Sequence, residues 1–501
     1  MSLIIVLLCL ALVIGAYFYN NPLGHSSWFL TRRFINWFPL GMTYSFLYMG
    51  RYNLTVAKTA LGSGISNEEF GIIFAAGTLT YAFSFLINGP LVDKIGGKSG
   101  ILIAALGAAA ANCALGVITW LVLSGRLHMR LVGIFSVIYA LNMYFQSYGA
   151  VSIIKVKANW FHVRERGIFG AIFGTLISFG VYFAFDWGQA IVNLTKASAP
   201  ANDSWATPLL RRVFVPDGAT SDATWAVFFV PAAILTTWAL IDIFLIKDTP
   251  EEAGFPYLET HDASAGHMDE SYSALDLLKK VFLNPLMLMF AGIELTAGVL
   301  RNGIMQWYTI FGHEIKQAGA EGIVANWGLL LCLFGIVGGF AGGLISDKLF
   351  QSRRGPPAAI FCGIMLGLAG VMAAFLFKEP FLVGVAALLI VAAVTGVHSL
   401  MSGTAAADFG GRKASATSSG IVDGCVYLGS GIQSLGVGYL VTHHSWQWWP
   451  VFLMPFALIG SLIAARIWNE LPAATRKFIH ENEGRKGHGA SHKTAAARVS
   501  S

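Results

Sequence analysis

Thirteen runs of apolar residues, each about 20 residues long, constrain this chain more than any other feature of its sequence. A helix rises 1.5 Å per residue, so a run of this length crosses the roughly 30 Å hydrocarbon core of a bilayer. The composition agrees, because only 12% of the residues are charged, against about 25% in soluble domains. The sequence therefore predicts an all-α membrane protein. Helices are expected near 2–19, 35–57, 70–91, 98–123, 131–156, 167–190, 224–246, 284–311, 323–346, 357–377, 381–407, 414–440 and 447–468.

The first run stands apart from the other twelve. No basic residue precedes it and no clean small-residue cleavage site follows it, which favours an anchor helix over a cleaved signal peptide. A polar stretch from Lys247 to Lys280 divides the remaining runs into six and six. We therefore expect an extra N-terminal transmembrane helix and short loop over 1–33, a six-helix bundle over 34–247, a cytoplasmic linker over 248–283, a second six-helix bundle over 284–469, and a polar cytoplasmic tail over 470–501.

The two halves of the chain echo each other. Three pairs of landmarks have nearly one separation: Arg51 and Arg301 are 250 residues apart, Asp93 and Asp347 are 254 apart, and Arg164 and Arg412 are 248 apart. Such an internal duplication is typical of transporters that expose one central site alternately to the two sides of a membrane. We therefore expect two pseudo-symmetric bundles with a site at their interface.

Arg51 lies inside a run that otherwise has the character of a membrane-spanning helix. A charge at that depth costs at least ~2.5–3.5 kcal/mol, so it should line a cavity or have a partner. Tyr44, Tyr48 and Arg51 are spaced four and three residues apart and share one helix face. Guanidinium and hydroxyl groups are donors that suit a phosphate or a carboxylate. The pattern predicts an anion site at Arg51 and Arg301; the alternative is a structural pairing of each arginine with a buried carboxylate.

Short motifs connect the chain to a known family. GPLVDKIGGK, at 89–98, is similar to the G-x-x-x-D-[KR]-x-G-[RK]-[KR] loop between the second and third helices of the major facilitator superfamily. YSFLYMGRYNLTVAK, WFHVRERG, WAVFFVPAAI, LRNGIMQW and SDKLFQSRRG resemble the organophosphate:phosphate antiporter family, which includes glycerol-3-phosphate and hexose-phosphate transporters. The resemblance implies a major facilitator fold, and exchange of a phosphorylated metabolite for inorganic phosphate by rocker-switch alternating access.

The resemblance also implies roles for single residues. Arg51 and Arg301 match the two arginines that bind phosphate in the family. The family's tyrosines fall on Tyr44, Tyr48, Tyr81 and Tyr427. Four other family positions are changed: a lysine is replaced by Phe85, a histidine by Ile177, and two tyrosines by Gly298 and Gly396. The anion clamp is kept while its surroundings differ, which leaves the identity of the substrate open.

Three titratable residues of the second half are candidates for coupling or for substrate contact. Glu294 lies seven residues before Arg301, two turns away on the same helix face. It could join the polar cluster, bind a cationic part of the substrate or carry a proton. Asp423 lies one turn before Tyr427, and His398 titrates near neutral pH. The structural alternative for the two carboxylates is a helix–helix hydrogen bond or a position near the lipid surface, and for His398 it is a packed histidine with satisfied hydrogen bonds.

Three further carboxylates are expected to have structural roles. Asp93 and Asp347 lie at inner helix ends beside basic residues, where charge pairing can hold one conformation closed, so we expect gating and structural roles for both. Asp186 is expected near the outer end of its helix as a structural or rim residue.

Basic residues in the short loops predict the orientation. Those expected on the cytoplasmic side are Lys94, Lys98, Arg164, Arg166, Lys348, Arg353, Arg354, Arg412 and Lys413, and they outnumber Arg126, Arg130, Arg211 and Arg212 on the other side. We expect a monomeric multi-pass protein of the bacterial inner membrane with a cytoplasmic C-terminus. Its expected partners are the lipid bilayer, a small anionic organic substrate, and inorganic phosphate or protons.

Several classes of function are not supported by the sequence. The five cysteines lie in apolar runs without a CxxC pair, and neither a metal-ligand spacing nor a nucleophile–base arrangement stands out. A nucleic-acid signature is also missing. We therefore expect no enzyme activity, no cofactor and no metal. Two alternatives to phosphate exchange stay open: a proton-coupled symporter of organic anions, and a transporter-like membrane sensor of sugar phosphates.

Overall fold

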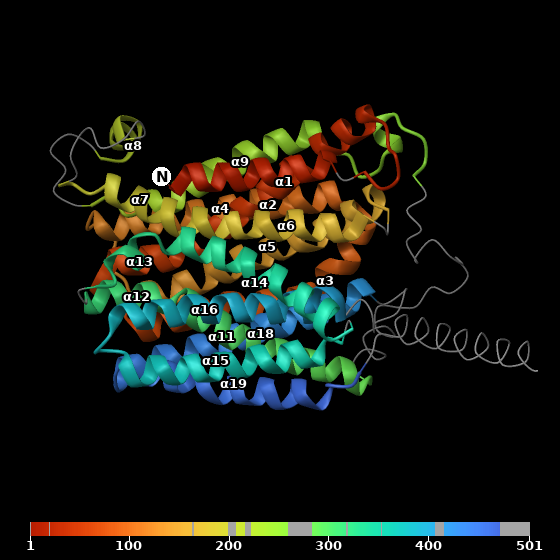
Figure 1. The fold of residues 1–501 in the computed structure, drawn as a ribbon. Coiled ribbons are helices and arrows are strands. Elements are labelled where there is room, and N and C mark those ends of the chain that lie inside the picture. The colour runs from red at the N-terminus through yellow and green to blue at the C-terminus, as the bar shows by residue number, and fades with distance from the viewer. Residues whose placement is uncertain are drawn as a thin grey trace, which may run out of the picture.

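A computed structural model describes residues 2–19, 21–162, 165–198, 207–215, 222–258, 283–316, 319–351, 353–405 and 415–470. Every regular element in those residues is helical, which confirms the predicted all-α class. The long helices run side by side in Figure 1. The middle of the expected linker (259–282), the expected tail beyond Glu470, and the landmarks Arg164 and Arg412 lie outside the described residues.

The helices follow the apolar runs of the sequence. The first half contains α1 (Ser2–Tyr19), α2 (Ser27–Leu61), α3 (Asn67–Ile95), α4 (Gly97–Leu123), α5 (Leu131–Trp160), α6 (Arg166–Tyr182), the π-helical turn η3 (Phe183–Trp187), α7 (Gly188–Leu194), α8 (Thr207–Phe214) and α9 (Ala226–Leu245). The second half contains α11 (Pro285–Met305), α12 (Trp307–Ile315), α13 (Glu321–Ala325), α14 (Trp327–Leu349), α15 (Gly355–Phe375), α16 (Pro380–His398), the π-helical turn η6 (Ser399–Ala405), α18 (Ser415–His443) and α19 (Trp448–Arg466).

Nine helices in the described part of the chain are long and apolar enough to cross a membrane. Four other expected spans are also long enough, but their mean hydropathy is lower: α2, α5, α11 and α18. These four helices carry Arg51, Gln146, Arg301 and Tyr427. Their lower hydropathy follows from polar side chains that face the interior of the protein, where they are shielded from lipid.

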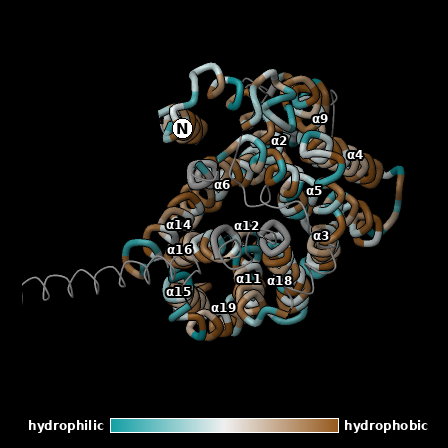
Figure 2. The backbone as a smooth tube through the Cα atoms, turned by 90° about the vertical axis from the view of Figure 1, so that its right-hand side faces the viewer, coloured by the Kyte–Doolittle hydropathy of each residue, from teal (hydrophilic) through white to brown (hydrophobic). Residues whose placement is uncertain are grey.

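The helices form two groups that lie beside each other. Figure 2 looks along the helices, with α2, α4, α5 and α9 in one group and α11, α15, α16, α18 and α19 in the other. Helix α3 packs on α18, and α6 packs on α14, so these two pairs join the halves. Helix α1 packs beside α6 at the outside of the bundle.

Helix α2 begins earlier than the sequence suggested. The side chain of Ser26 accepts a hydrogen bond of 3.2 Å from the Phe29 backbone N–H and caps the helix. Arg33 therefore lies in a helix and not in a loop. Its guanidinium donates two hydrogen bonds, of 2.8 and 2.9 Å, to Glu165 and a third, of 2.9 Å, to the hydroxyl of Tyr17 in α1. These buried contacts attach α1 to the bundle.

The loop in the GPLVDKIGGK motif is explained by backbone geometry. Gly96 has φ = +88°, and a Cβ atom there would lie 2.4 Å from a carboxylate oxygen of Asp248. The same carboxylate accepts a hydrogen bond of 2.8 Å from the backbone N–H of Lys98. The motif therefore ties the start of α4 to the segment that follows α9.

Two helices depart from the expected continuous spans. The run 284–311 is divided between α11 and α12, with Gln306 between them. The run 167–190 contains the π-helical turn η3, which carries Asp186. The two carboxylate oxygens of Asp186 accept hydrogen bonds of 2.7 and 3.1 Å from the backbone N–H groups of Gly328 and Leu329, in the first turn of α14. Asp186 thus has the structural role that was expected, and it joins the two halves.

Candidate functional site

Arg51 in α2 is fully buried, with an exposed fraction of 0%. Its Nε donates to Gln146 in α5 at 3.0 Å, and its Nη1 donates to the hydroxyl of Tyr427 in α18 at 2.7 Å. Tyr139, also in α5, donates to the Arg51 carbonyl at 3.0 Å. Within the described residues, the third nitrogen, Nη2, has no hydrogen-bond partner. The guanidinium is therefore held in place from both halves while one of its nitrogens remains available to a ligand.

Three tyrosine rings surround the guanidinium of Arg51. Its Cζ lies 4.6 Å from the ring centroid of Tyr48, 4.6 Å from that of Tyr81 and 5.5 Å from that of Tyr427. Contacts of this kind stabilise a desolvated cation by roughly 0.5–2 kcal/mol each. No ion pair between Arg51 and a carboxylate forms in the described part of the chain. The described residues therefore do not support the structural alternative, in which Arg51 pairs with a buried carboxylate.

The two arginines meet at Tyr48. Tyr48 interacts with the guanidinium of Arg301, in α11, as well as with that of Arg51. Tyr44 lies one turn earlier in α2 and packs edge-on against Tyr48, with ring centroids 5.5 Å apart. Arg301 itself is half-buried. The structure thus brings together the arginines and the four tyrosines that the sequence selected.

The second half contributes a cluster of titratable side chains. Nδ1 of His398 lies 3.1 Å from Oε2 of Glu294. Glu294 is fully buried, and its Oε1 has no hydrogen-bond partner among the described residues. Ser402 donates a hydrogen bond to Asp423, and Asp423 interacts electrostatically with His398, Glu294 and Arg301. All three candidates from the sequence therefore lie in one cluster beside Arg301.

His398 shows that this cluster borders solvent. Its side chain is 31% exposed, although it lies deep between the helices. An exposed fraction of this size in the middle of a bundle means that the side chain faces an internal space wide enough for water. Water can therefore reach the His398 ring, while Glu294 behind it is 0% exposed.

Helix packing explains two of the changed family positions. A Cβ atom at Gly298 would lie 2.0 Å from the carbonyl oxygen of Val426, so α11 and α18 approach too closely there for any side chain. A Cβ atom at Gly396 would lie 2.9 Å from the ring of Phe361.

The other two changed family positions are Phe85 and Ile177. Phe85 packs edge-on against Tyr81, with ring centroids 4.8 Å apart, and Ile177 is half-buried.

Asp93 and Asp347 form ion pairs near the helix ends. Asp93 lies 3.0 Å from Lys155, and Asp347 lies 2.8 Å from Arg354. Each of these pairs lies within one half of the chain, and the two carboxylate side chains are 66% and 57% exposed. Ion pairs this exposed typically contribute about 0–1 kcal/mol. A gating role for Asp93 and Asp347 stays a prediction.

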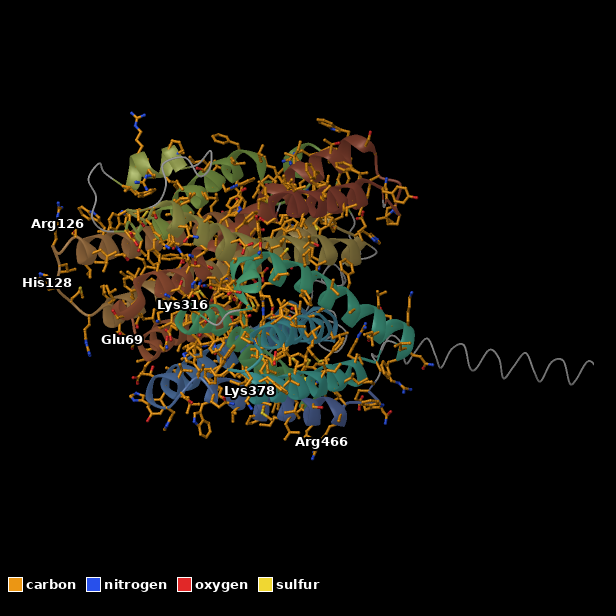
Figure 3. The ribbon with its side chains drawn as sticks, turned by 60° about the vertical axis from the view of Figure 1, so that its left-hand side comes forward. Glu69, Arg126, His128, Lys316, Lys378 and Arg466 are labelled. Atoms are coloured by element: carbon orange, nitrogen blue, oxygen red, sulfur yellow. The ribbon has the colours of Figure 1, made fainter. Side chains whose placement is uncertain are left out.

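Polar contacts join the two halves at the end of the bundle where α2 ends and α3 begins, which we call the α2–α3 end. Lys58 pairs with Glu314 at 3.1 Å, and Asn67 donates to the same carboxylate at 3.1 Å. Glu68 lies 3.0 Å from a ring nitrogen of His443. In Figure 3, Glu69, Arg126 and His128 gather at this end of the bundle. The halves are therefore fastened together at the α2–α3 end.

The opposite end, where α9 ends and α11 begins, is called the linker end. The ion pairs described there are His25–Glu165, Arg33–Glu165, Lys155–Asp93 and Arg354–Asp347. Each of these pairs joins residues of the same half. The described ion pairs thus fasten the halves to each other at one end of the bundle and strengthen each half separately at the other.

A cavity of about 620 Å³ lies at the α2–α3 end, away from the arginines. Its lining includes Lys196, His313 and Lys316, together with Asp222 and Glu321. This lining thus contains two carboxylates as well as two lysines, whereas no described carboxylate forms an ion pair with Arg51. We therefore place the candidate anion site at Arg51 and Arg301, and not in this cavity.

Sequence reasoning missed several residues of the site. Gln146 orients Arg51, and Tyr52 donates a hydrogen bond of 3.1 Å to Asn302, which follows Arg301. Asn142 donates to the Gly50 carbonyl at 2.9 Å and accepts from Gln146 at 3.1 Å. The signal for this group was a stripe of polar side chains at helical spacing along α5, made by Tyr139, Asn142 and Gln146. Among the described residues, no group of His, Cys, Asp and Glu side chains could hold a metal ion.

Comparison with known proteins identifies the family. The model of the Major Facilitator Superfamily matches residues 40–434, which is most of the chain. The chain belongs to the major facilitator superfamily. This assignment confirms the fold and the multi-pass membrane class that the sequence predicted.

Curated relatives of this superfamily member include proteins that are named as transporters of phosphorylated compounds. This chain is 25% identical over 442 residues to the glycerol-3-phosphate transporter of Bacillus subtilis. The alignment covers 85% of this chain and 90% of the relative. The chain is 21% identical over 458 residues to a probable hexose phosphate transport protein of Chlamydia trachomatis, covering 87% and 91%. It is 23% identical over 420 residues to the membrane sensor protein UhpC of Escherichia coli, covering 82% and 86%. The resemblance to the organophosphate:phosphate antiporter family is confirmed, and none of these relatives is named as an enzyme.

Solved structures of the superfamily share the fold. A bacterial homologue of the human lysosomal transporter Spinster, in an inward-facing and unoccupied conformation, matches with a TM-score of 0.67 at 15% identity, covering 89% of this chain and 98% of the other. The transporter FucP in an outward conformation matches with a TM-score of 0.56 at 15% identity, covering 88% and 100%.

Proposed function

We propose that this superfamily member is a secondary transporter that exchanges a phosphorylated or other anionic small organic metabolite for inorganic phosphate. The observation that carries the proposal is that Arg51 and Arg301, from the two halves, both interact with Tyr48. Planar guanidinium groups can each donate paired N–H bonds to one phosphate. The relatives named as glycerol-3-phosphate and hexose phosphate transporters support a phosphorylated cargo.

The proposed mechanism is rocker-switch alternating access. Cargo enters between the halves, and its anionic group binds Arg51 and Arg301 together. Without an anion, the two like charges oppose closure of the halves around the site. A bound anion removes that repulsion, so the halves tilt and the site opens to the other side. Return with an empty site is disfavoured, and inorganic phosphate allows it, which makes the process an exchange.

The contacts between the halves support a particular state of this cycle. Lys58, Glu314 and Asn67 join the halves at the α2–α3 end, whereas the ion pairs described at the linker end lie within one half, which supports a state that is open at the linker end. Because the basic short loops predict that the linker end is cytoplasmic, we propose that this state faces inward. We also propose a monomer in a bacterial inner membrane with a cytoplasmic C-terminus.

Two other functions each have an observation in their favour. The Glu294–His398 pair, at 3.1 Å and partly reached by solvent, suits a proton-coupled symporter of organic anions. The relative named as a membrane sensor supports a sensor, and the relative named as a hexose phosphate transport protein supports a sugar phosphate as its ligand.

Proteoliposomes containing the full chain and loaded with inorganic phosphate separate the three functions. We expect uptake of glycerol-3-phosphate or glucose-6-phosphate that requires internal phosphate and is unchanged by a pH gradient. Uptake driven by the pH gradient without internal phosphate would instead establish the symporter. Saturable binding of a sugar phosphate with no flux would establish the sensor.

A further inference from the structure

The candidate site carries opposite charges in its two parts. Arg51, within its ring of tyrosines, has an available donor, Nη2, while Glu294 has an available acceptor, Oε1. Both side chains are 0% exposed. We propose that the cargo is a zwitterion that carries an ammonium group as well as its phosphate or phosphonate. This inference rests on the proposed function and names the class of substrate more closely.

The charges of the second-half cluster favour a cationic group. Glu294 and Asp423 both lie within electrostatic range of His398, and Asp423 also lies within range of Arg301. A phosphate that binds Arg51 and Arg301 uses the positive charge of both arginines, so of these groups only His398 is left to balance the two carboxylates. Leaving a carboxylate buried without a counter-charge is costly. An ammonium group on the same ligand supplies the missing charge.

The spacing along α11 fits one ligand that reaches both groups. Glu294 and Arg301 are seven residues apart, which is two helical turns, or roughly 10 Å along the axis, on one face. A ligand that lies along this face can therefore reach both groups with a short carbon skeleton between its phosphate and its ammonium. The partly exposed ring of His398, 3.1 Å from Glu294, places solvent access at the ammonium end.

A hydroxyl group in place of the ammonium would satisfy Oε1 of Glu294 but not its charge. A hydroxyl donates one hydrogen bond, whereas an ammonium donates three and carries the positive charge. The two substituents are therefore distinguishable by affinity. Hydrogen bonds to charged groups are strong enough to expect a difference of about tenfold or more.

Two pairs of compounds test the inference on the full chain in phosphate-loaded proteoliposomes. Phosphoethanolamine is compared with 2-hydroxyethyl phosphate, and glucosamine-6-phosphate with glucose-6-phosphate, as competitors of phosphate counterflow. In each pair the members differ only in an amine or a hydroxyl. We expect the amine of at least one pair to inhibit at about tenfold lower concentration. Equal inhibition within both pairs, or stronger inhibition by the hydroxyl compounds, would overturn the inference and leave the phosphate exchanger intact.

Substitutions locate the ammonium site. Glu294→Gln and Asp423→Asn should each reduce the preference for the amine. The inhibitory concentration of the hydroxyl compound divided by that of the amine compound should fall toward one. Asp242→Asn is the matched control, because Asp242 is also fully buried and also has one carboxylate oxygen without a hydrogen-bond partner among the described residues. Asp242 lies in the first half, where Thr43 donates to its other oxygen at 2.6 Å, so this variant should keep the wild-type preference. A preference that survives both cluster substitutions contradicts the assignment of Glu294 and Asp423. Failure of all four compounds to compete, with phosphate counterflow itself absent, would reject the proposed exchange instead.

Discussion

Nζ of Lys58 in α2 lies 3.1 Å from Oε1 of Glu314 in α12, and this ion pair joins the two halves of the bundle. Lys58 is only 4% exposed, whereas the Glu314 side chain is 35% exposed. The other carboxylate oxygen accepts hydrogen bonds from Asn67 at 3.1 Å and from Trp446 at 3.3 Å. One carboxylate therefore binds donors from both halves at the α2–α3 end.

Replacing Glu314 by glutamine should open the α2–α3 end more often. The amide keeps the size of the side chain but removes the charge opposite the nearly buried Lys58, a loss of about 1 kcal/mol for a partly exposed pair. That corresponds to a shift of about fivefold in the ratio of closed to open molecules. Distances between spin labels at Ser63 and His444, in a cysteine-free background, measure this ratio. The exposed Glu321, replaced by glutamine, is the control, and an unchanged distance distribution in Glu314→Gln would exclude this role.

Arg51→Lys and Arg301→Lys should each remove most of the exchange. A lysine keeps the charge but lacks the planar fork that binds two phosphate oxygens at once. At Arg51 it also cannot hold Gln146 and Tyr427 in the present geometry. We expect counterflow to fall by roughly 10–100-fold. Arg126→Lys is the control, since Arg126 lies at the α2–α3 end against Trp120. Near-normal counterflow in both Arg51→Lys and Arg301→Lys would reject the clamp.

Gln146→Leu should weaken cargo binding more than it slows transport. The change leaves Nε of buried Arg51 without its acceptor, a cost of about 1–3 kcal/mol, and frees the guanidinium to turn. We expect the apparent KM of counterflow to rise by about tenfold, with a smaller change in the maximal rate. Gln146→Glu should be more harmful, because a carboxylate would pair with Arg51 in place of the cargo. An unchanged KM in both variants would mean that Gln146 does not position Arg51.

Glu165→Gln should destabilise the fold without involving the site. Arg33 and Glu165 are each 2% exposed, and removing one partner of a buried pair typically costs about 3–5 kcal/mol. We expect a clearly lower midpoint of thermal unfolding in detergent. Glu251, which is exposed, provides the control substitution Glu251→Gln. Equal midpoints for the two variants would show that the Arg33 ion pair contributes little.

The same ion pair predicts a dependence on pH. Burial raises the pKa of Glu165, but the hydrogen bonds and charge of Arg33 lower it by more than burial raises it, so the pKa lies below its ordinary value of 4.5. The ionised carboxylate therefore stabilises the fold above that value, and the contribution is lost as the pH falls through the lowered pKa. Between neutral pH and pH values below 4.5, the wild type should lose more thermal stability than Glu165→Gln. A parallel loss in both proteins would contradict the assignment.

The sequence by itself determined the membrane class, the placement of most helices and the paired arginines. These features depend on the length of apolar runs, on helical spacing and on repeated landmarks, all of which are local or nearly so. It placed the start of α2 too late, because the cap made by Ser26 lies outside the apolar run. It also missed the break after α11, where the run stays apolar on both sides.

Only the tertiary structure decided which side chains meet. Arg51 bonds to Gln146, 95 residues away, and to Tyr427, 376 residues away. The pairing of Glu294 with His398 likewise joins residues 104 apart. No local pattern encodes these partners, since they depend on how closely whole helices approach, as at Gly298 against Val426. The arginines could therefore be read from the sequence, whereas the way they are held, and the acidic cluster beside them, followed from packing.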